Sequence, residues 1–451
     1  MKTKRHGRVY LIMDILGRLD FAYPLLIKLL FENIYIVKYH YYWSYLGTTY
    51  NPNYEKAVIS WVVAIIFAIM VKICARTKLS ALFGVLVNIS AIPSLSIYWL
   101  KNQSSEAFWL IVLYWSIWWF CTFVLSSADK KKDGWNCQGQ RQSFIPDINN
   151  TIVLIVYIWT VVTTLYLSMR YGGLRLFIDL GDVYTYRLSG VSMSSIEGYI
   201  FAWNTNALLP ILFGVHYLQD RKILFCSDMV LMLLSYGIFG NKSMLMTIPL
   251  VFGVIILHRM DMMKHFGSMI GVFIAVYVVA SFFVPSQMFV ALGDRILDGP
   301  AAGHYNYYDF FSNHGNPLLY LRESILRAFA NSPYEQGITR IIGSSAKYYS
   351  GAYNNMNNGL FSMAYANFGI AGVIVQPIII VVTFHLFCKL LEDYDDVMIY
   401  ILALIHALFL ISTSYFSWLI TGGLVIDALV LFAIRRYDFL RLYSKRVRLR
   451  I

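Results

Sequence analysis

Apolar runs long enough to cross a bilayer recur from one end of this 451-residue chain to the other. Each helical crossing needs about 20 apolar residues, and inside the bilayer every backbone polar group must be bonded within the protein. The composition agrees with this reading, since 58% of the residues are hydrophobic and 14% are charged, against about 25% charged in soluble domains. A soluble enzyme, a coiled coil and a disordered chain are therefore excluded, and we expect an all-α polytopic membrane protein.

Windowed hydropathy predicts about twelve transmembrane helices in a single integral membrane domain, residues 1–451. The predicted spans are 9–31, 57–73, 80–100, 107–125, 151–168, 199–218, 223–239, 243–257, 268–285, 359–387, 397–412 and 417–434. The first is interrupted by Asp14, Arg18, Asp20 and Lys28. Asp14 and Arg18 are spaced to pair on one helix face, and an interfacial amphipathic helix is the alternative.

The positive charges predict the orientation of the chain. If both termini are cytoplasmic, 23 of the 37 Lys and Arg residues fall in inside segments and 12 in outside segments, as the positive-inside rule requires. The topology then accounts for the positive residues behind the net charge of +12, and we expect no nucleic-acid partner.

Two predicted outer loops, 169–198 and 286–357, are much longer than the other connections. Long loops without a domain of their own are usually functional or disordered. The second contains eight tyrosines and a predicted short helix that begins at Asn316 and carries an apolar stripe as far as Phe329. We therefore expect two large outer loops that contain short helices and carry the chemistry.

Both loops combine arginines with carboxylates. The arginines are Arg170, Arg175 and Arg187 in the first loop and Arg295, Arg322, Arg327 and Arg340 in the second. The planar fork of arginine suits bidentate phosphate binding, so the combination favours a lipid-linked phosphosugar at the outer leaflet. For any single arginine, a solvated charge or one that faces lipid headgroups is the alternative.

Amides at the ends of predicted spans support a carbohydrate ligand. Asn357 and Asn358 run directly into a span that contains Tyr365, and Asn204 occupies the outer third of another. Amides in hydrocarbon must find partners or face a wet cavity. Hydrogen bonding between helices is the alternative.

A break at Gly240–Ser243 separates two apolar runs on the predicted outer side. A helix that begins near Ser243 would present free N–H groups beside Lys242, which suits an anionic headgroup or diphosphate. A plain hairpin turn is the alternative.

Residues 357–372 resemble the segment after the large periplasmic loop of the Wzy-type oligosaccharide repeat-unit polymerases, which make O-antigen and capsular polysaccharide. The Gly240–Ser243 break resembles the basic Gly/Ser motif of that family, which also carries an Arg-x10-Gly motif in each of two large periplasmic loops. That spacing occurs in this chain three times, at Arg187/Gly198, Arg340/Gly351 and Arg170/Gly181. Arg170 adjoins a span, so Arg187 is the preferred match in the first loop.

The resemblance implies an inverting glycosyltransferase of GT-C-like type that uses neither a metal nor a cofactor. It would join undecaprenyl-diphosphate-linked oligosaccharides at the outer face of a bacterial cytoplasmic (inner) membrane, with periplasmic loops and both termini cytoplasmic. Besides membrane lipids, the expected partners are a chain-length regulator and a flippase.

The resemblance also implies roles for particular residues. Arg187, Arg340 and Lys242 would contact the diphosphate, with Arg322 as a fourth candidate. For the base, the residues themselves suggest His304 and His314, because histidine titrates in a useful range; His314 is preferred, and Asp309 lies between the two histidines. The remaining expected substrate contacts are Arg170, Arg322, Arg327, Asn204, Asn357, Asn358 and Tyr365.

Two other functions remain open. An O-antigen ligase uses the same donor and a different acceptor, and Arg322 to Leu326 fits the short Arg-x3-Leu pattern of that family. A lipid-linked oligosaccharide flippase has a similar number of spans, but it needs no 72-residue outer loop and usually shows two related halves.

Overall fold

The computed structural model describes residues 22–44, 48–74, 78–132, 148–176, 193–260, 263, 266–284, 289–290, 293–316, 318, 331–345, 355–392 and 394–435. In these residues the regular structure is helical and no strand forms, which confirms the all-α prediction. Ile148 and Arg435 form one isolated antiparallel bridge. The chain divides into two compact units: 1–137, 254–386 and 403–419 form the first, and 138–253, 387–402 and 420–451 form the second.

The first unit contains the helices of residues 22–132 and those of residues 266–345. They are α2 (Ala22–Ile34), η1 (Tyr35–Tyr39), α3 (His40–Tyr42), α4 (Tyr54–Cys74), α5 (Lys78–Leu86), η2 (Val87–Ala91), α6 (Ile92–Leu100), α7 (Ser105–Lys132), α14 (Phe266–Phe283), η6 (Asp294–Asp298), α16 (Gly299–His314) and α18 (Ile338–Ser345).

The second unit is built from helices in the middle of the chain and one near its end. They are α8 (Asn150–Leu167), η3 (Ser168–Gly172), α10 (Ser195–Trp203), η4 (Asn204–Leu208), α11 (Leu209–Leu218), α12 (Lys222–Phe239) and α22 (Leu424–Ile434). Four more helices have residues in both units: α13 (Lys242–Arg259), α19 (Leu360–Leu390), α20 (Asp396–Ser412) and α21 (Tyr415–Ile420).

Among the described residues, seven helical segments are long and apolar enough to cross a membrane. They are Tyr54–Ile73, Leu82–Leu100, Ser105–Ala128, Asn150–Gly172, Lys222–Phe239, Leu360–Leu390 and Tyr415–Ile434. Shorter apolar helices, Met244–Arg259, Met269–Phe283 and Asp396–Ser412, coincide with three further predicted spans. The protein is therefore a helical membrane protein.

Two predicted spans differ from this set, and the total of about twelve stays a prediction. Residues 199–218 form three consecutive elements, α10, η4 and α11, with a π-helical turn between two short α-helices. Most of the first predicted span, 9–21, lies outside the described residues.

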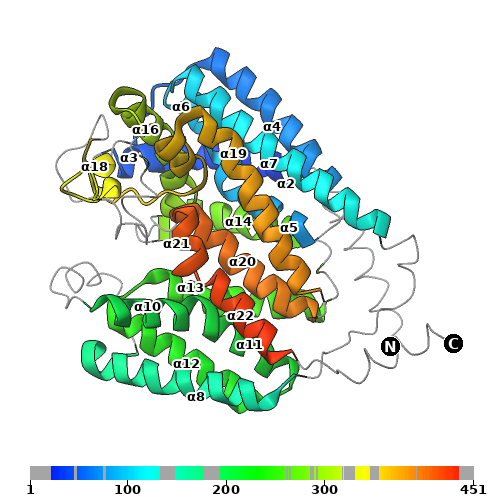
Figure 1. Ribbon diagram of the computed structural model, residues 1–451. Coiled ribbons are helices and arrows are strands. Elements are labelled where there is room, and N and C mark those ends of the chain that lie inside the picture. The colour runs from blue at the N-terminus through cyan, green and yellow to red at the C-terminus, as the bar shows by residue number, and fades with distance from the viewer. Residues whose placement is uncertain are drawn as a thin grey trace. The chain divides into compact units, whose positions relative to one another are not determined.

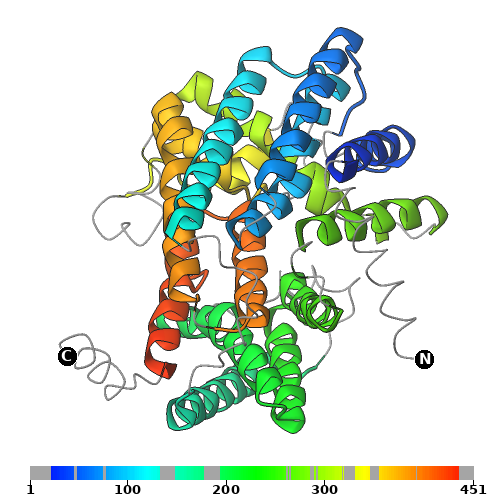
Figure 2. The same cartoon turned by 90° about the vertical axis from the view of Figure 1, so that its right-hand side faces the viewer.

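Close helix packing organises the first unit. α4 and α7 lie side by side (Figure 1), and the view turned by 90° shows α7 beside α19 (Figure 2). Tyr114 of α7 donates to Gln376 Oε1 of α19 at 3.4 Å. α5 and α14 approach at two glycines, since a Cβ on Gly84 would lie 3.1 Å from Gly267 Cα. Such small residues allow helices in a membrane to pack closely.

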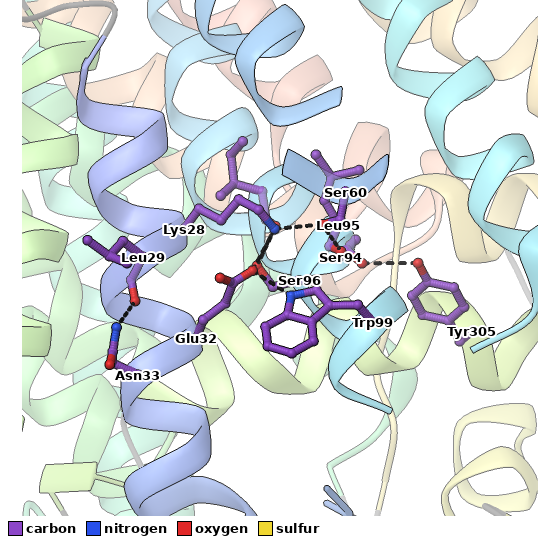
Figure 3. A network of polar contacts seen from close by, with 11 residues as sticks. Lys28, Leu29, Glu32, Asn33, Ser60, Ser94, Leu95, Ser96, Trp99 and Tyr305 are labelled. Carbon is purple, nitrogen blue, oxygen red and sulfur yellow. Dashed lines mark hydrogen bonds and ion pairs between the residues drawn. The ribbon is translucent and has the colours of Figure 1, made fainter. Parts of the chain in front are cut away.

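The centre of this unit holds a buried ion pair (Figure 3). Lys28 Nζ lies 2.6 Å from Glu32 Oε1, and the lysine side chain is completely buried. Its remaining donors reach Ser60 Oγ at 2.6 Å and Ser96 Oγ at 3.2 Å, while Trp99 Nε1 donates to Glu32 Oε1 at 2.7 Å. One buried ammonium group therefore joins α2, α4 and α6.

α19 is broken near its start. Gly369 has φ 58° and ψ −139°, which interrupts the helix. The break frees carbonyls of the preceding turn, and Asn316 Nδ2 donates to the Tyr365 carbonyl at 2.5 Å. The short helix predicted to begin at Asn316 lies almost entirely outside the described residues.

We expect Lys28→Met to destabilise the protein by about 3–5 kcal/mol, because it leaves the Glu32 carboxylate buried without its counter-charge. Thermal unfolding of the full chain in detergent measures the loss. Lys222→Met is the matched control: Lys222 is 84% exposed and lies 3.9 Å from Asp220, so its effect should stay within about 0.5 kcal/mol. A Lys28→Met protein that melts like the wild type would contradict the structural role of the pair.

Candidate functional site

A capping box fixes Glu197 at the start of α10. Ser194 Oγ accepts from the Glu197 N–H, and the Glu197 carboxylate accepts from the Ser194 N–H. The Ser194 hydroxyl donates to Glu197 Oε2 at 2.6 Å, and the Tyr171 hydroxyl donates to the same oxygen at 2.7 Å. These hydrogen bonds from Ser194 and Tyr171 lower the pKa of Glu197 to about 2, so the carboxylate stays ionised.

Glu197 holds the guanidinium of Arg170. Arg170 Nη1 lies 3.0 Å from Glu197 Oε1 and also donates to the Tyr166 hydroxyl. The guanidinium stacks near the rings of Tyr166 and Tyr171, at 5.9 and 5.3 Å. The Arg170 side chain is nevertheless 54% exposed. One edge of the guanidinium is therefore held by Glu197 and Tyr166, while the rest of the side chain is exposed and could meet an anion.

A pocket begins next to this ion pair. Its volume is about 450 Å³, and its lining residues are Met193, Gly198, Phe201, Phe239 and Asn241. Gly198 directly follows Glu197 in the chain, so the first turn of α10 supplies both the carboxylate that holds Arg170 and a residue of the pocket lining. The lining is mostly apolar, with the Asn241 amide as its polar side chain.

The predicted break at Gly240–Ser243 is present at the rim of this pocket. Gly240 has φ 64° and ends α12, and α13 begins at Lys242. The side chain of Lys242 lies outside the described residues. The chain after η3 packs against the same end of α12, because a Cβ on Gly237 would lie 1.8 Å from the Arg175 carbonyl oxygen.

Asn204, predicted to contact substrate, is buried against α8. Its Nδ2 donates to Thr163 Oγ1 at 2.7 Å and to Thr164 Oγ1 at 3.4 Å. The amide nitrogen of Asn204 is therefore used for hydrogen bonding between helices, which was the alternative to substrate contact. Its Oδ1 is buried without a hydrogen-bond partner.

In the first unit, Asn358 joins α19 to α16. Its Nδ2 donates to the Pro300 carbonyl at 3.0 Å and to Ser362 Oγ at 2.7 Å. His304 lies in the same cluster, with Nδ1 2.8 Å from Ser362 Oγ and Nε2 3.0 Å from Ser90 Oγ. Burial lowers the pKa of His304 to about 3, so the imidazole is neutral and bridges two hydroxyl groups.

The other predicted residues of the first unit range from exposed to buried. Asn357, Asp309 and His314 are exposed, and the His314 ring stacks on Phe310 with centroids 4.2 Å apart. Tyr365 packs against Tyr308, with ring centroids 5.0 Å apart. Arg340 is half-buried on α18. α16 thus carries Asp309 and His314. It also carries Pro300, which accepts from Asn358, and Tyr308, which packs against Tyr365.

Arg187, Arg322 and Arg327 lie outside the described residues. The two long segments predicted to be outer loops belong to different units, so their expected joint site stays a prediction. Among the residues that the structure describes, no three His, Cys, Asp or Glu side chains are grouped to hold a metal ion.

Glu197 is a residue of this arrangement that the sequence analysis did not single out. The signal was the Ser194-x-x-Glu197 spacing, which is a capping box. The four-residue spacing of Tyr166 and Arg170 was a second signal, since such pairs share a helix face.

The fold defines a helical membrane protein, in which the exposed guanidinium of Arg170 and a mostly apolar pocket both adjoin the first turn of α10. In comparisons with known proteins, no family model, no curated protein and no solved structure matches the chain.

We expect acid to destabilise the protein through His304. Its folded pKa lies below the value of about 6.5 that it takes when unfolded, so the unfolded state binds the extra proton. The contribution is complete above pH 6.5 and is lost as the pH falls towards 3, which amounts to about 2 kcal/mol at pH 5. Melting temperatures between pH 7.5 and 5 should fall more steeply for the wild type than for His304→Gln. Parallel pH profiles would contradict the assignment.

Proposed function

We propose that this protein polymerises lipid-linked oligosaccharides: it joins undecaprenyl-diphosphate-linked repeat units into O-antigen or capsular polysaccharide at the outer face of a bacterial inner membrane. The observation that carries the proposal is the Arg170 guanidinium, held by Glu197 and Tyr166 yet 54% exposed beside a mostly apolar pocket. An isoprenoid diphosphate combines the two properties that such a site selects, a dianionic head and an apolar chain.

The geometry suits a leaving diphosphate. Arg170 offers a planar fork from η3. α13 begins at Lys242, directly after the pocket residue Asn241, so the first N–H groups of that helix follow Asn241 in the chain. Positive and N–H groups at this position would stabilise the charge that develops on the diphosphate as its bond to the sugar breaks. Arg187, Arg340, Arg322, Arg327 and Lys242 are further proposed contacts, on the strength of the sequence resemblance.

The proposed reaction is an inverting displacement. An acceptor hydroxyl oxygen forms a bond to the anomeric carbon of the donor, and the bond from that carbon to the diphosphate oxygen breaks. The electron pair leaves with the lipid diphosphate, and the hydroxyl proton passes to a base. His314 and Asp309, both exposed on α16, are the proposed proton acceptors. Because diphosphate is a good leaving group, cationic stabilisation matters more than an acid.

We expect Arg170→Ala to lower the polymerisation rate by about 10²–10³, by analogy with the loss of one oxyanion donor. Arg170→Lys should restore part of the rate, because it keeps the charge and loses the fork. The measurement is gel display of surface polysaccharide in cells that lack the gene and express each variant. Arg221→Ala is the control: Arg221 donates to Asn150 at the opposite end of α8 and should leave the ladder unchanged.

The same gel separates the rival functions. Loss of the ladder with one repeat unit retained on the surface indicates a polymerase, whereas loss of every repeat unit indicates a ligase or a flippase. Normal ladders from Arg170→Ala, Arg187→Ala and Arg340→Ala, at wild-type protein levels, would refute the proposed site.

A further inference from the structure

Five π-helical turns occur in the part of the chain that the structure describes: η1, η2, η3, η4 and η6. π-Helix normally accounts for well under 1% of residues and is found mostly at functional sites. Each of these turns carries a buried side-chain polar atom without a hydrogen-bond partner. The five atoms are Tyr39 Oη, Asn88 Oδ1, Ser168 Oγ, Asn204 Oδ1 and Asp298 Oδ1. Buried polar atoms are nearly always paired, so this association calls for a physical reason.

Two of the five turns, η1 and η6, approach each other in the first unit. A Cβ on Gly293, the residue before η6, would lie 2.4 Å from Tyr39 Oη of η1. Tyr277 fixes this end of η6, because its hydroxyl accepts from the Gly293 N–H at 2.7 Å and donates to the Phe289 carbonyl. The unpartnered Tyr39 hydroxyl therefore lies against the turn that carries Asp298.

η6 also places two carboxyl groups together. Asp294 and Asp298 are four residues apart in the turn, and Asp298 is 3% exposed. Asp298 Oδ2 accepts from Thr48 Oγ1 at 3.5 Å, and Oδ1 has no partner other than the neighbouring carboxyl group of Asp294. Burial raises the pKa of Asp298, and burial together with the charge of Asp298 raises the pKa of Asp294. Lys101 opposes both shifts.

These groups match the chemistry of a sugar. Carboxyl groups offer acceptors, and a donor as well when they are protonated, and the Tyr39 and Thr48 hydroxyls both donate and accept. Sugar hydroxyl groups likewise donate and accept. A metal cation fits less well, because the ammonium group of Lys101 acts on the same carboxylates.

We propose that Tyr39 and Asp298 form a subsite for the hydroxyl groups of a carbohydrate. The identification of that carbohydrate as the acceptor sugar rests on the proposed polymerase function. Both atoms are covered in this structure, so binding requires η1 to move relative to η6. The extra residue in each π turn provides a place where the helix can change its register.

Tyr39→Phe separates this role from a purely structural one. The substitution removes a hydroxyl that has no partner, so it should leave the melting temperature unchanged or higher. It should weaken binding of a labelled, lipid-free oligosaccharide, released from the lipid-linked repeat units of the host, by about five- to tenfold. Fluorescence anisotropy with the full chain in detergent measures that affinity. Asp298→Asn should weaken the same binding by at least as much.

Tyr305→Phe is the matched control, because the Tyr305 hydroxyl donates to the Ser94 carbonyl at 3.0 Å. This variant should melt at a lower temperature and bind the oligosaccharide as the wild type does. Wild-type affinity in both Tyr39→Phe and Asp298→Asn, or no binding by the wild-type protein, would overturn the subsite.

A second probe distinguishes failure of the subsite from failure of the proposed function. Undecaprenyl diphosphate without a sugar should bind the wild type and Tyr39→Phe equally, and Arg170→Ala at least tenfold more weakly. If this pattern holds while Tyr39→Phe binds the oligosaccharide normally, only the subsite is wrong. If Arg170→Ala binds the lipid diphosphate normally, the proposed diphosphate site is wrong.

Discussion

The first unit depends on how it accommodates one charge, the ammonium group of Lys28. A buried charge costs several kcal/mol unless it is paired and its donors are bonded. Glu32 supplies the counter-charge, and two serine hydroxyls from α4 and α6 take the other donors. The pairing therefore fixes the relative positions of three helices, which apolar contacts alone would leave free to slide.

The same constraint explains the neighbouring polar chain. Ser94 lies two residues before Ser96 on α6, and its carbonyl accepts from Tyr305 of α16. One residue earlier, His304 bridges Ser90 and Ser362, where Asn358 also donates. Buried polar contacts therefore link α6, which contacts the ion pair, to α16, the helix that carries the proposed base. In the second unit the ion pair of Arg170 and Glu197 is instead at the surface, where an anion can reach it.

Local sequence signals accounted for much of the site. The break at Gly240 was predicted because glycine adopts positive φ at little cost, and the structure has φ 64° there. The chemistry of Arg170 was predicted from its residue type, but its partners come from positions 166 and 197. Asn204 illustrates the limit, because an amide in a span can face a ligand or another helix, and only packing against Thr163 decides which.

By itself, the sequence determined an all-α membrane protein, because long apolar runs leave the backbone no partner except its own carbonyl groups. It also predicted the helix break at Gly240, whereas the break at Gly369 and the π turn η4 fall inside predicted spans. Only the tertiary structure decided which polar side chains are satisfied. Lys28, Glu197 and Asp298 have their environments set by residues distant in the chain. The π turns were likewise decided only by the tertiary structure. They change the register of a helix where it packs against its neighbours, and no local sequence pattern specifies those neighbours.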